Sequence, residues 1–359
     1  WPQMCTSAEQ IGTKFFFAFG YNVPENYLVH WDGSYELDTS AEVLWPSGLR
    51  TKISRSFVND ILKAVPRRGD GTMHVLASHA IEGKGIGPFD FQGTRPDDPN
   101  DIFLHQERLE LRGYRVFCAW LNHNDSDAVN TFDTYVADEE GYGWVKHYLI
   151  DFGTILGSGA VQPHARRVGH EYYIEFSPSL KAAATFGIWD RPWRKIKYPD
   201  FTSIGRFECK HFQPETWKPD YPNPAFDKMQ PQDAFWATRT VMRFSDEAIR
   251  AIVKTGKLEE AGAEEYLVKT LVERRDKIVR HYLLQINPLD SFRLVADGDR
   301  LVLGFENLGQ TAKLAGGSRY RYRWFRFNNL NEELTVLGGE NETDGLAVPV
   351  PQDPGSEFL

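Results

Sequence analysis

The sequence predicts an α+β fold that carries a β-rich extension at its C-terminal end. The chain has 359 residues, of which 41% are hydrophobic and 14% aromatic, and this composition supports packed domains rather than a disordered chain. Helix-like and strand-like patterns alternate up to residue 287, whereas strand patterns separated by Gly and Asn follow Pro288. We therefore expect an α/β region at 1–81, a mainly helical region at 82–287, a β-rich unit at 288–351 and a frayed tail at 352–359.

The first region is expected to combine two helices with three strands. Residues 7–19 have a helical pattern that Gly20 ends. Residues 27–31 have a strand pattern, and the turn at 32–34 is expected to lead into its partner strand. A short helix at 56–64 and a strand at 72–81 complete the region.

The second region is dominated by helical patterns. The Gly-rich, acidic stretch at 82–101 is expected to be a functional loop, since structureless loops of this length are uncommon in compact domains. Helices are expected at 105–121, at 233–254 with one interruption, and at 261–284. The Pro-, Trp- and Tyr-rich stretch 192–231 lacks periodicity, and we expect it to wrap over the core as irregular structure.

A β-hairpin is predicted directly after the first of these helices. Two strand patterns, at 131–137 and 144–151, flank an acidic turn that contains Gly. If the chain folds back about residues 140–141, Asn130 faces Asp151 across the two strands. Directly opposed residues of an antiparallel pair have Cβ atoms roughly 4.5–5.5 Å apart, so these two side chains are expected to meet.

These residues have the chemistry of a divalent-cation site. The amide oxygen of Asn130 and the carboxylate of Asp151 are ligands of the kind that Mg²⁺ prefers. Asp125, just before the hairpin, is placed to accept a proton. Two other interpretations remain open. One is an acidic surface hairpin in which Asn130 only caps a turn, and the other is a zinc site built from His123 and both Asp residues, whose spacing fits no zinc motif.

Two arginine pairs are candidates for binding an anion. Arg108 and Arg112 are one helical turn apart, so they can grip a phosphate together or instead pair with nearby carboxylates. Arg166 and Arg167 can receive an anionic substrate or form a solvated pair.

The motifs around Asp125 resemble those of protein kinases. His123, Asp125 and Asn130 have the order and spacing of the kinase catalytic loop, with Asn124 in place of its Arg. The triplet Asp-Phe-Gly follows at 151–153, as it does in kinases. Each motif alone is weak, but their order and spacing together strengthen the resemblance.

The nearest resemblance is to the spore-coat CotH and HipA type of atypical bacterial kinase-like proteins. The stretches 8–25 and 94–123 carry it, and it spans residues 7–153 and is faint through residue 284. It implies a protein-kinase-like fold with a partial N-lobe at 1–81 and a helical C-lobe at 82–287, while the residues beyond Pro288 lie outside it.

The resemblance also implies roles for individual residues. Asp125 would be the catalytic base, and Asn130 and Asp151 would hold Mg²⁺. Glu9 would pair with a Lys that contacts ATP, so ATP and Mg²⁺ are the implied cofactors. His123 is expected to hold the catalytic loop by hydrogen bonds.

The chain departs from the family pattern near its start. The strand that carries the Lys and the Gly-rich loop over the phosphates should precede Glu9, but only eight residues do so. The chain begins at Trp1 rather than Met, so we expect either a further upstream segment or a kinase-derived fold without standard ATP binding. The Gly-rich stretch 83–88 lacks the phosphate-loop pattern.

The leading prediction is a divergent kinase-like protein that binds a nucleotide with Mg²⁺ and transfers a phosphoryl group. The alternatives are a pseudokinase or non-catalytic subunit that binds a protein partner, and a metal-dependent phosphoesterase. A net charge of −9 argues against nucleic acid as a partner. The chain has no run of ~18 apolar residues, so no membrane span is predicted. The resemblance to exported bacterial proteins favours an exported or periplasmic location.

Overall fold

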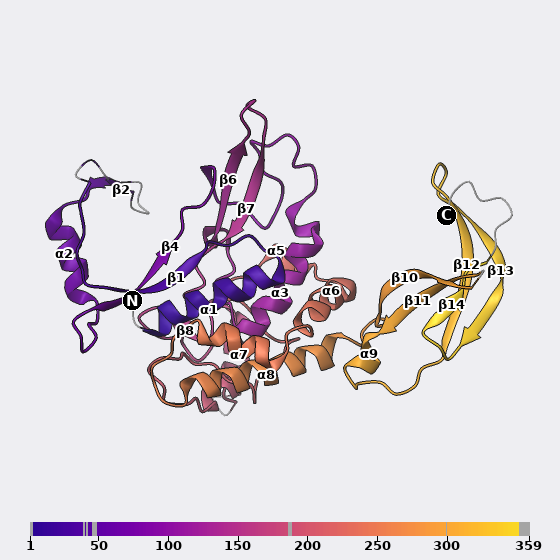
Figure 1. Ribbon diagram of the computed structural model, residues 1–359. Helices are drawn as coiled ribbons and strands as arrows, with labels where there is room; N and C mark the ends of the chain where they lie inside the picture. The colour runs from indigo at the N-terminus through magenta and orange to yellow at the C-terminus, as the bar shows by residue number, and fades with distance from the viewer. Residues whose placement is uncertain are drawn as a thin grey trace. The chain divides into compact units, whose positions relative to one another are not determined.

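The computed structural model of the protein has an α+β fold with many helices and several small sheets (Figure 1). It describes residues 3–38, 40, 42–44, 49–185, 189–298 and 300–351. The chain forms two compact units, Trp1–Ile278 and Val279–Leu359. No helix in the described ranges has both the length and the apolar character that crossing a lipid bilayer requires.

The first helix belongs to the core of the larger unit. α1 (Gln3–Phe19) ends at the expected residue but begins earlier than predicted, because the residues of its first turn are also buried. Phe15 meets the ring of Trp120 edge-on at 5.2 Å, and Phe19 stacks on Phe117 at 4.2 Å. Each buried aromatic side chain removes roughly 150–250 Å² from water, so these contacts hold α1 firmly against the body.

Two strands of the first region pair with each other in an order that the sequence did not predict. β1 (Asn26–Trp31) is antiparallel to β4 (Met73–Ser78). The expected turn at 32–34 forms through Asp–Ser hydrogen bonds, but the chain then leaves β1. Pairing with β4 buries Leu28 and Met73 beside α1, which explains the preference. Between the two strands lie β2 (Glu42–Leu44), β3 (Arg50–Lys52) and α2 (Arg55–Ala64), the last of which was predicted.

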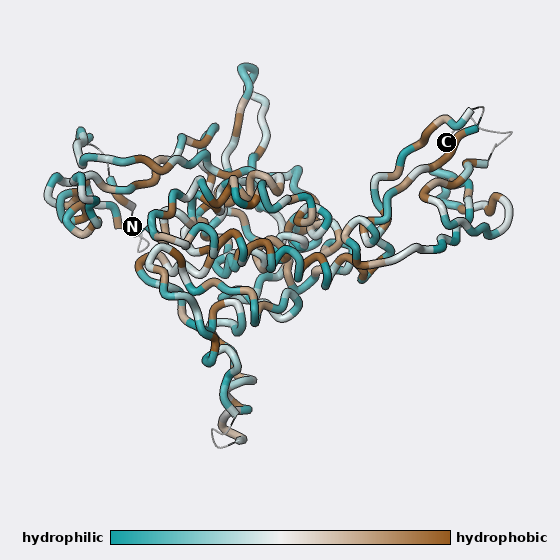
Figure 2. The backbone as a smooth tube through the Cα atoms, turned by 60° about the horizontal axis from the view of Figure 1, so that its bottom comes forward, coloured by the Kyte–Doolittle hydropathy of each residue, from teal (hydrophilic) through white to brown (hydrophobic). Residues whose placement is uncertain are grey.

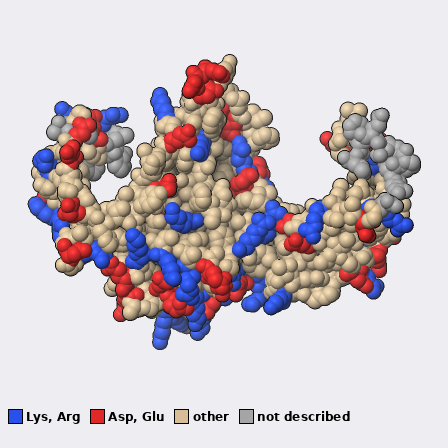
Figure 3. Space-filling view, viewed as in Figure 1, with Lys and Arg blue, Asp and Glu red and all other residues tan. Residues whose placement is uncertain are grey.

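A three-stranded antiparallel sheet contains the predicted hairpin. Its strands are β5 (Lys84–Gly87), β6 (Thr131–Ala137) and β7 (Gly143–Leu149). β5 lies in the stretch expected to be a loop, because its glycines weaken the residue pattern by which a strand is predicted. At Gly85 an added Cβ would lie 2.6 Å from the ring of Phe132, so only glycine lets the strands approach. The hairpin tip is hydrophilic (Figure 2) and carries acidic side chains (Figure 3).

The register of this hairpin differs by one residue from the prediction. Continuing the observed pairing, Asn130 lies opposite Ile150, whose N–H donates to the Asn130 carbonyl at 3.0 Å. The turn is centred on Glu140 because the Asp138 carboxylate accepts a hydrogen bond from the Glu140 N–H at 3.0 Å. The predicted direct opposition of Asn130 and Asp151 is therefore wrong.

The helix that precedes the catalytic-like loop is shorter than predicted. A separate 3₁₀ turn (His105–Glu107) comes first, and α3 (Leu109–Leu121) begins only after Arg108. Asp101 causes the break, because its carboxylate binds both the His105 ring and the Arg108 guanidinium, at 2.6 Å each.

A buried arginine holds the C-terminal end of α3. Arg274, on α8 (Ala263–Tyr282), donates to the carbonyls of Ala119 and Trp120 in the last turn of α3. Its guanidinium lies over the ring of Phe212 at 3.5 Å. Burial lowers the pKa of Arg274 to about 10, so it stays protonated at neutral pH. The loop that follows α3 therefore starts from a fixed point.

The second predicted late helix, at 261–284, is α8. The remaining elements of the larger unit are η2 (Ala128–Asn130), β8 (Ser158–Gly159), β9 (Gln162–Pro163), α4 (Phe176–Ala184), η3 (Pro192–Lys195), α5 (Pro224–Asp227), α6 (Pro231–Val241) and α7 (Asp246–Lys254). The helix expected at 233–254 is divided because Ser245 caps α7, its hydroxyl accepting from the Ala248 N–H at 3.2 Å.

The smaller unit consists mainly of strands, which agrees with the composition after Pro288. One sheet contains β10 (Leu289–Asp297), β11 (Arg300–Asn307) and β14 (Ala347–Pro349), the other contains β12 (Tyr320–Asn328) and β13 (Glu333–Thr343), and α9 (Leu308–Thr311) follows β11. Phe305, Tyr320 and Val348 form its core. The predicted tail at 352–359 lies outside the described residues.

Candidate functional site

The loop between α3 and β6 is held by residues far along the chain. Asn122 adopts a left-handed conformation with a φ of 55°, and its side-chain oxygen accepts from the indole N–H of Trp217 at 2.8 Å. The Asn124 side-chain amide donates to the Asp220 carboxylate at 2.7 Å, and the Asn124 backbone carbonyl accepts from the Asp220 N–H at 2.8 Å. Asn124, which stands where kinases have Arg, therefore fixes the loop to the irregular segment.

Asp125 and Asn130 contact each other within this loop. The Asn130 amide nitrogen donates to the Asp125 backbone carbonyl at 2.7 Å, and a side-chain hydrogen bond also joins Asn130 to the Asp125 carboxylate. Burial raises the pKa of Asp125, and neighbouring carboxylates, Asp151 first among them, raise it further, whereas the bond to Asn130 lowers it. Asp125 is thus a half-buried base with increased proton affinity.

Asp151 lies just beyond β7, in a backbone conformation that few residues adopt. Its φ is 59°, a left-handed value that Asp and Asn tolerate better than most residues. The next residue, Phe152, is fully buried and stacks on Phe16 of α1 at 4.6 Å with an angle of 15°. At Gly12, also on α1, an added Cβ would lie 2.5 Å from the Phe152 Cβ. The absence of a side chain at Gly12 therefore brings α1 against the Asp-Phe-Gly triplet.

Glu9 approaches the same triplet from α1. Its carboxylate accepts hydrogen bonds from the Phe152 N–H and from the Asn26 amide, the latter at 2.8 Å. Burial raises the pKa of Glu9 to about 7, and the charge of Asp151 contributes to the rise. In the described part of the chain no Lys or Arg forms an ion pair with Glu9, so the Lys that the family resemblance implies is not found there.

Asn130 contacts Asp125, and Asp151 interacts electrostatically with Asp125 and Glu9, but the predicted strand register that would place Asn130 against Asp151 is wrong. Glu9, Asp125 and Asp151 form one group of electrostatically interacting carboxylates, which Asn130 joins through Asp125. We call these four residues the carboxylate group. Within the described ranges no group of three His, Cys, Asp or Glu side chains is arranged to hold a metal ion.

His123 does not act as the resemblance implies. It is 1% exposed, and burial lowers the pKa of its ring to about 3, so the ring is neutral. Its Nδ1 has no hydrogen-bond partner among the residues that the structure describes. The ring instead packs against Phe16 and Phe152, with centroids 5.6 Å away in both cases. His123 therefore supports the site by aromatic packing with α1 and the Asp-Phe-Gly triplet.

The arginines that could bind an anion are used within the fold. Arg108 binds Asp101. Arg112 donates from Nε and Nη2 to the two carboxylate oxygens of Asp233, at 2.6 and 2.8 Å. Arg167 binds Asp220 at 2.7 Å, and Arg166 donates to the Ile196 carbonyl. For Arg108 and Arg112 the structure shows the alternative of pairing with carboxylates. Arg166 and Arg167 form neither of the expected arrangements among these contacts, because each binds a group within the fold.

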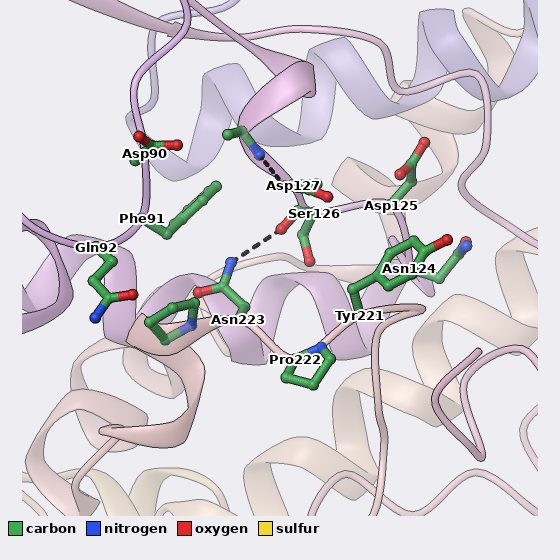
Figure 4. Close-up of a pocket in the computed structure, with 12 residues that line it drawn as sticks. Asp90, Phe91, Gln92, Asn124, Asp125, Ser126, Asp127, Tyr221, Pro222 and Asn223 are labelled. Carbon is green, nitrogen blue, oxygen red and sulfur yellow. Dashed lines mark hydrogen bonds between the residues drawn. The ribbon is translucent and has the colours of Figure 1, made fainter. Parts of the chain in front are cut away.

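A pocket of about 460 Å³ opens beside Asp125 (Figure 4). Three segments form it: residues 90–92, 124–128 and 221–224. Asn223 fixes two of them together, because its amide donates to the Ser126 carbonyl at 3.0 Å. The sequence gives no local signal for this pocket, since its walls come from segments that meet only in the folded chain.

Comparisons with protein-family models, with curated proteins and with solved structures find no match for this chain.

The raised pKa of Glu9 predicts a pH-dependent stability. The folded-state pKa is about 7 and the ordinary value is 4.5, so the folded chain holds a proton that the unfolded chain releases between these values. The free energy of unfolding should therefore fall as pH rises from about 4.5 to 7, by on the order of 3 kcal/mol from this group. Urea unfolding of the native chain and of Glu9→Gln across this range measures it. Parallel pH curves for the two proteins would contradict the assignment.

Proposed function

We propose that this protein is a divergent kinase-like protein that binds a nucleotide with Mg²⁺ and transfers a phosphoryl group. The observation that carries the proposal is the carboxylate group itself, whose members come from α1, the loop after α3, η2 and the residue pair after β7. Catalysis of phosphoryl transfer rests almost entirely on positioning and on stabilising charge. A half-buried base beside oxygen ligands is an arrangement suited to both.

Each member of the group has surroundings that support its role. Asp125, whose pKa is raised by burial, accepts the proton of the attacking hydroxyl. Asn130 uses its amide nitrogen to hold Asp125, which leaves its amide oxygen as the atom that can bind a cation. Asp151 is exposed, and its carboxylate has no hydrogen bond or ion pair with another described residue. It therefore remains available as a ligand.

Asn130 and Asp151 carry oxygen ligands of the kind that Mg²⁺ takes in sites where it binds ATP. Mg²⁺ in phosphoryl-transfer sites usually takes one or two carboxylates together with substrate phosphates and keeps several waters. Asn130 and Asp151 would hold the ion, and its charge would supply electrostatic stabilisation of the transferring phosphoryl group. A dication would also offset the repulsion between Asp125 and Asp151 that raises the pKa of Asp125.

A protein-kinase-like fold is part of the same proposal. Its support is the order of elements: α1 with Glu9, the β1–β4 pair, α3, the loop with Asp125, the β6–β7 hairpin, the Asp-Phe-Gly triplet and then helices. In kinases the packing of the triplet's Phe distinguishes active from inactive states. Here Phe152 is buried between α1 and His123.

A non-catalytic role, in which the fold binds a protein partner, is the second candidate. Glu9 has no cationic partner in the described ranges, which favours it. A second observation is an exposed apolar face on the β12–β13 pair. Its members are Phe325, Phe327, Leu334 and Val336. Exposed apolar patches of this kind often mark binding surfaces.

Thermal unfolding with ATP tests the leading proposal. The melting temperature of the whole chain should rise with ATP and Mg²⁺ together, and this rise should disappear when EDTA removes the metal. At a ligand concentration 100 times the dissociation constant, the added stability is about 2.7 kcal/mol. Equal melting curves with and without ATP–Mg²⁺ would refute the leading proposal.

A further inference from the structure

α4 presents large apolar side chains to the solvent. Phe176 is 76% exposed and Leu180 is 69% exposed, and they share one face of the helix because they are four positions apart. Ile174, just before the helix, is 68% exposed. None of the described side chains of α4 is buried, and a helix of nine residues is marginal in water without packing. The apolar face of α4 is therefore suited to a partner that covers it.

The segment that carries α4 is closed at its two ends. The Glu171 carboxylate accepts hydrogen bonds from Nε of Arg191 at 3.0 Å and from the indole N–H of Trp193 at 2.8 Å. These two bonds join the residues before and after the stretch 172–190. This stretch, which we call the arm, therefore begins and ends at one fixed base.

Basic side chains are concentrated in the arm and directly after it. Residues 176–197 include five Lys or Arg and one Asp, in a chain whose net charge is −9. That carboxylate, Asp190, is bound by Arg194 at 3.1 Å. Lys195 and Lys197 are exposed, and neither forms an ion pair with another described residue. The exposed apolar face of α4 thus occurs together with a local excess of positive charge.

The carboxylates that flank the arm do not cancel this charge. Glu175 is bound by Lys218 at 2.6 Å, and Glu171 is bound at the base of the arm. Lys181, on α4, is exposed, and its ammonium lies over the ring of Trp189 at 4.6 Å. Lys, Trp and large apolar side chains are the residues by which helices lie at a membrane–water interface. The charge that remains after pairing is positive.

We propose that the arm binds an anionic lipid surface, with α4 lying in the plane of the interface. Phe176, Leu180 and Ile174 enter the boundary between headgroups and acyl chains, and Lys195 and Lys197 lie against the lipid phosphates. Binding of this kind depends on buried apolar area and on attraction to anionic lipids, and it needs no membrane-spanning helix. The inference is independent of the proposed function.

Flotation of the whole chain with lipid vesicles tests the electrostatic part. Vesicles of equal parts phosphatidylcholine and phosphatidylglycerol should bind the chain far more tightly than vesicles of phosphatidylcholine alone, because each Lys or Arg near an anionic surface adds about fivefold in affinity. Lys195→Gln should therefore weaken binding to the mixed vesicles about fivefold. Lys254→Gln, which replaces an exposed lysine at the end of α7, should leave it unchanged.

Leu180→Gln tests the apolar part with the same mixed vesicles. The loss of one large apolar side chain from the lipid boundary should weaken binding about tenfold or more. The variant should fold like the native chain, since Leu180 is largely exposed when no lipid is present. Phe17→Gln is the matched control, because Phe17 is a 71% exposed side chain on α1, and it should bind like the native chain.

A second copy of the chain is the other possible cover for α4, and the outcomes separate the two. No binding to the mixed vesicles, equal binding to both kinds of vesicle, or native binding by Leu180→Gln would overturn the inference. A dimer in analytical ultracentrifugation that Leu180→Gln dissociates, without vesicle binding, would show that a second copy covers the helix. None of these results depends on the ATP–Mg²⁺ test.

Discussion

Asp125→Asn should lower the rate of phosphoryl transfer roughly 10²–10⁴-fold, the usual contribution of a positioned general base. The substitution keeps the size of the side chain but removes its ability to accept a proton. Because the Asn130 amide holds the Asp125 backbone carbonyl, which the variant retains, the loop should keep its shape. ADP release from ATP, first with water and then with candidate acceptors, measures the effect.

The pH profile gives this prediction a second readout. Burial raises the pKa of Asp125, so the activity of the native chain should fall with decreasing pH at a midpoint above the ordinary Asp value of 3.8. Glu139→Gln, an exposed carboxylate replaced in the same way, should keep both the rate and the profile. If Asp125→Asn retains the native rate, Asp125 is not the base.

Asp151→Ala should abolish the stabilisation of the chain by ATP and Mg²⁺. Asp151 is the carboxylate proposed to hold the cation, and the amide oxygen of Asn130 alone is a weak substitute. The loss would amount to the whole ligand contribution, about 2.7 kcal/mol at 100 times the dissociation constant. Melting temperatures with and without ATP–Mg²⁺ measure it as a difference within each variant.

The backbone at Asp151 calls for a matched control. Its φ of 59° is left-handed, and in that region an Ala costs roughly 1–2 kcal/mol that Asn partly avoids. Asp151→Ala should therefore melt below the native chain even without ligand. Asp151→Asn keeps the conformation and removes the charge, so it should melt close to the native chain and still lose most of the ligand effect. A full ATP–Mg²⁺ response in Asp151→Asn would show that its charge binds no metal.

Local sequence patterns predict most elements near the site but not how strands pair. The helix now seen as α1 and both strands of the β6–β7 hairpin follow from periodicity and residue type. The register failed by one residue because the Asp138 carboxylate centres the turn on Glu140, a side-chain choice that strand patterns do not encode. β5 was missed because its glycines, which allow close approach to Phe132, also remove the strand signal.

Some features of the site follow from the sequence, whereas others depend on the folded chain. Motif spacing singles out Asp125, Asn130 and Asp151. In the structure Asn130 binds Asp125, and Asp151 interacts electrostatically with Asp125 and Glu9. Their roles remain predictions. The pocket could not be foreseen, because its walls meet through bonds such as that from Asn223 to Ser126, nearly a hundred residues apart. Nor does sequence show that His123 is buried among rings, since burial depends on α1.

Gly12 makes α1 and Asp151 mechanically dependent on each other. With no side chain to act as a spacer, α1 rests directly on Phe152, whose neighbour Asp151 has little conformational choice at its φ of 59°. A displacement of α1 must therefore move or strain Asp151. Any molecule that shifts α1 is then linked thermodynamically to any ligand at Asp151, and each changes the affinity of the other by the same factor. In a Gly12→Ala chain the added methyl group would press on Phe152 and would strain the backbone next to Asp151 permanently.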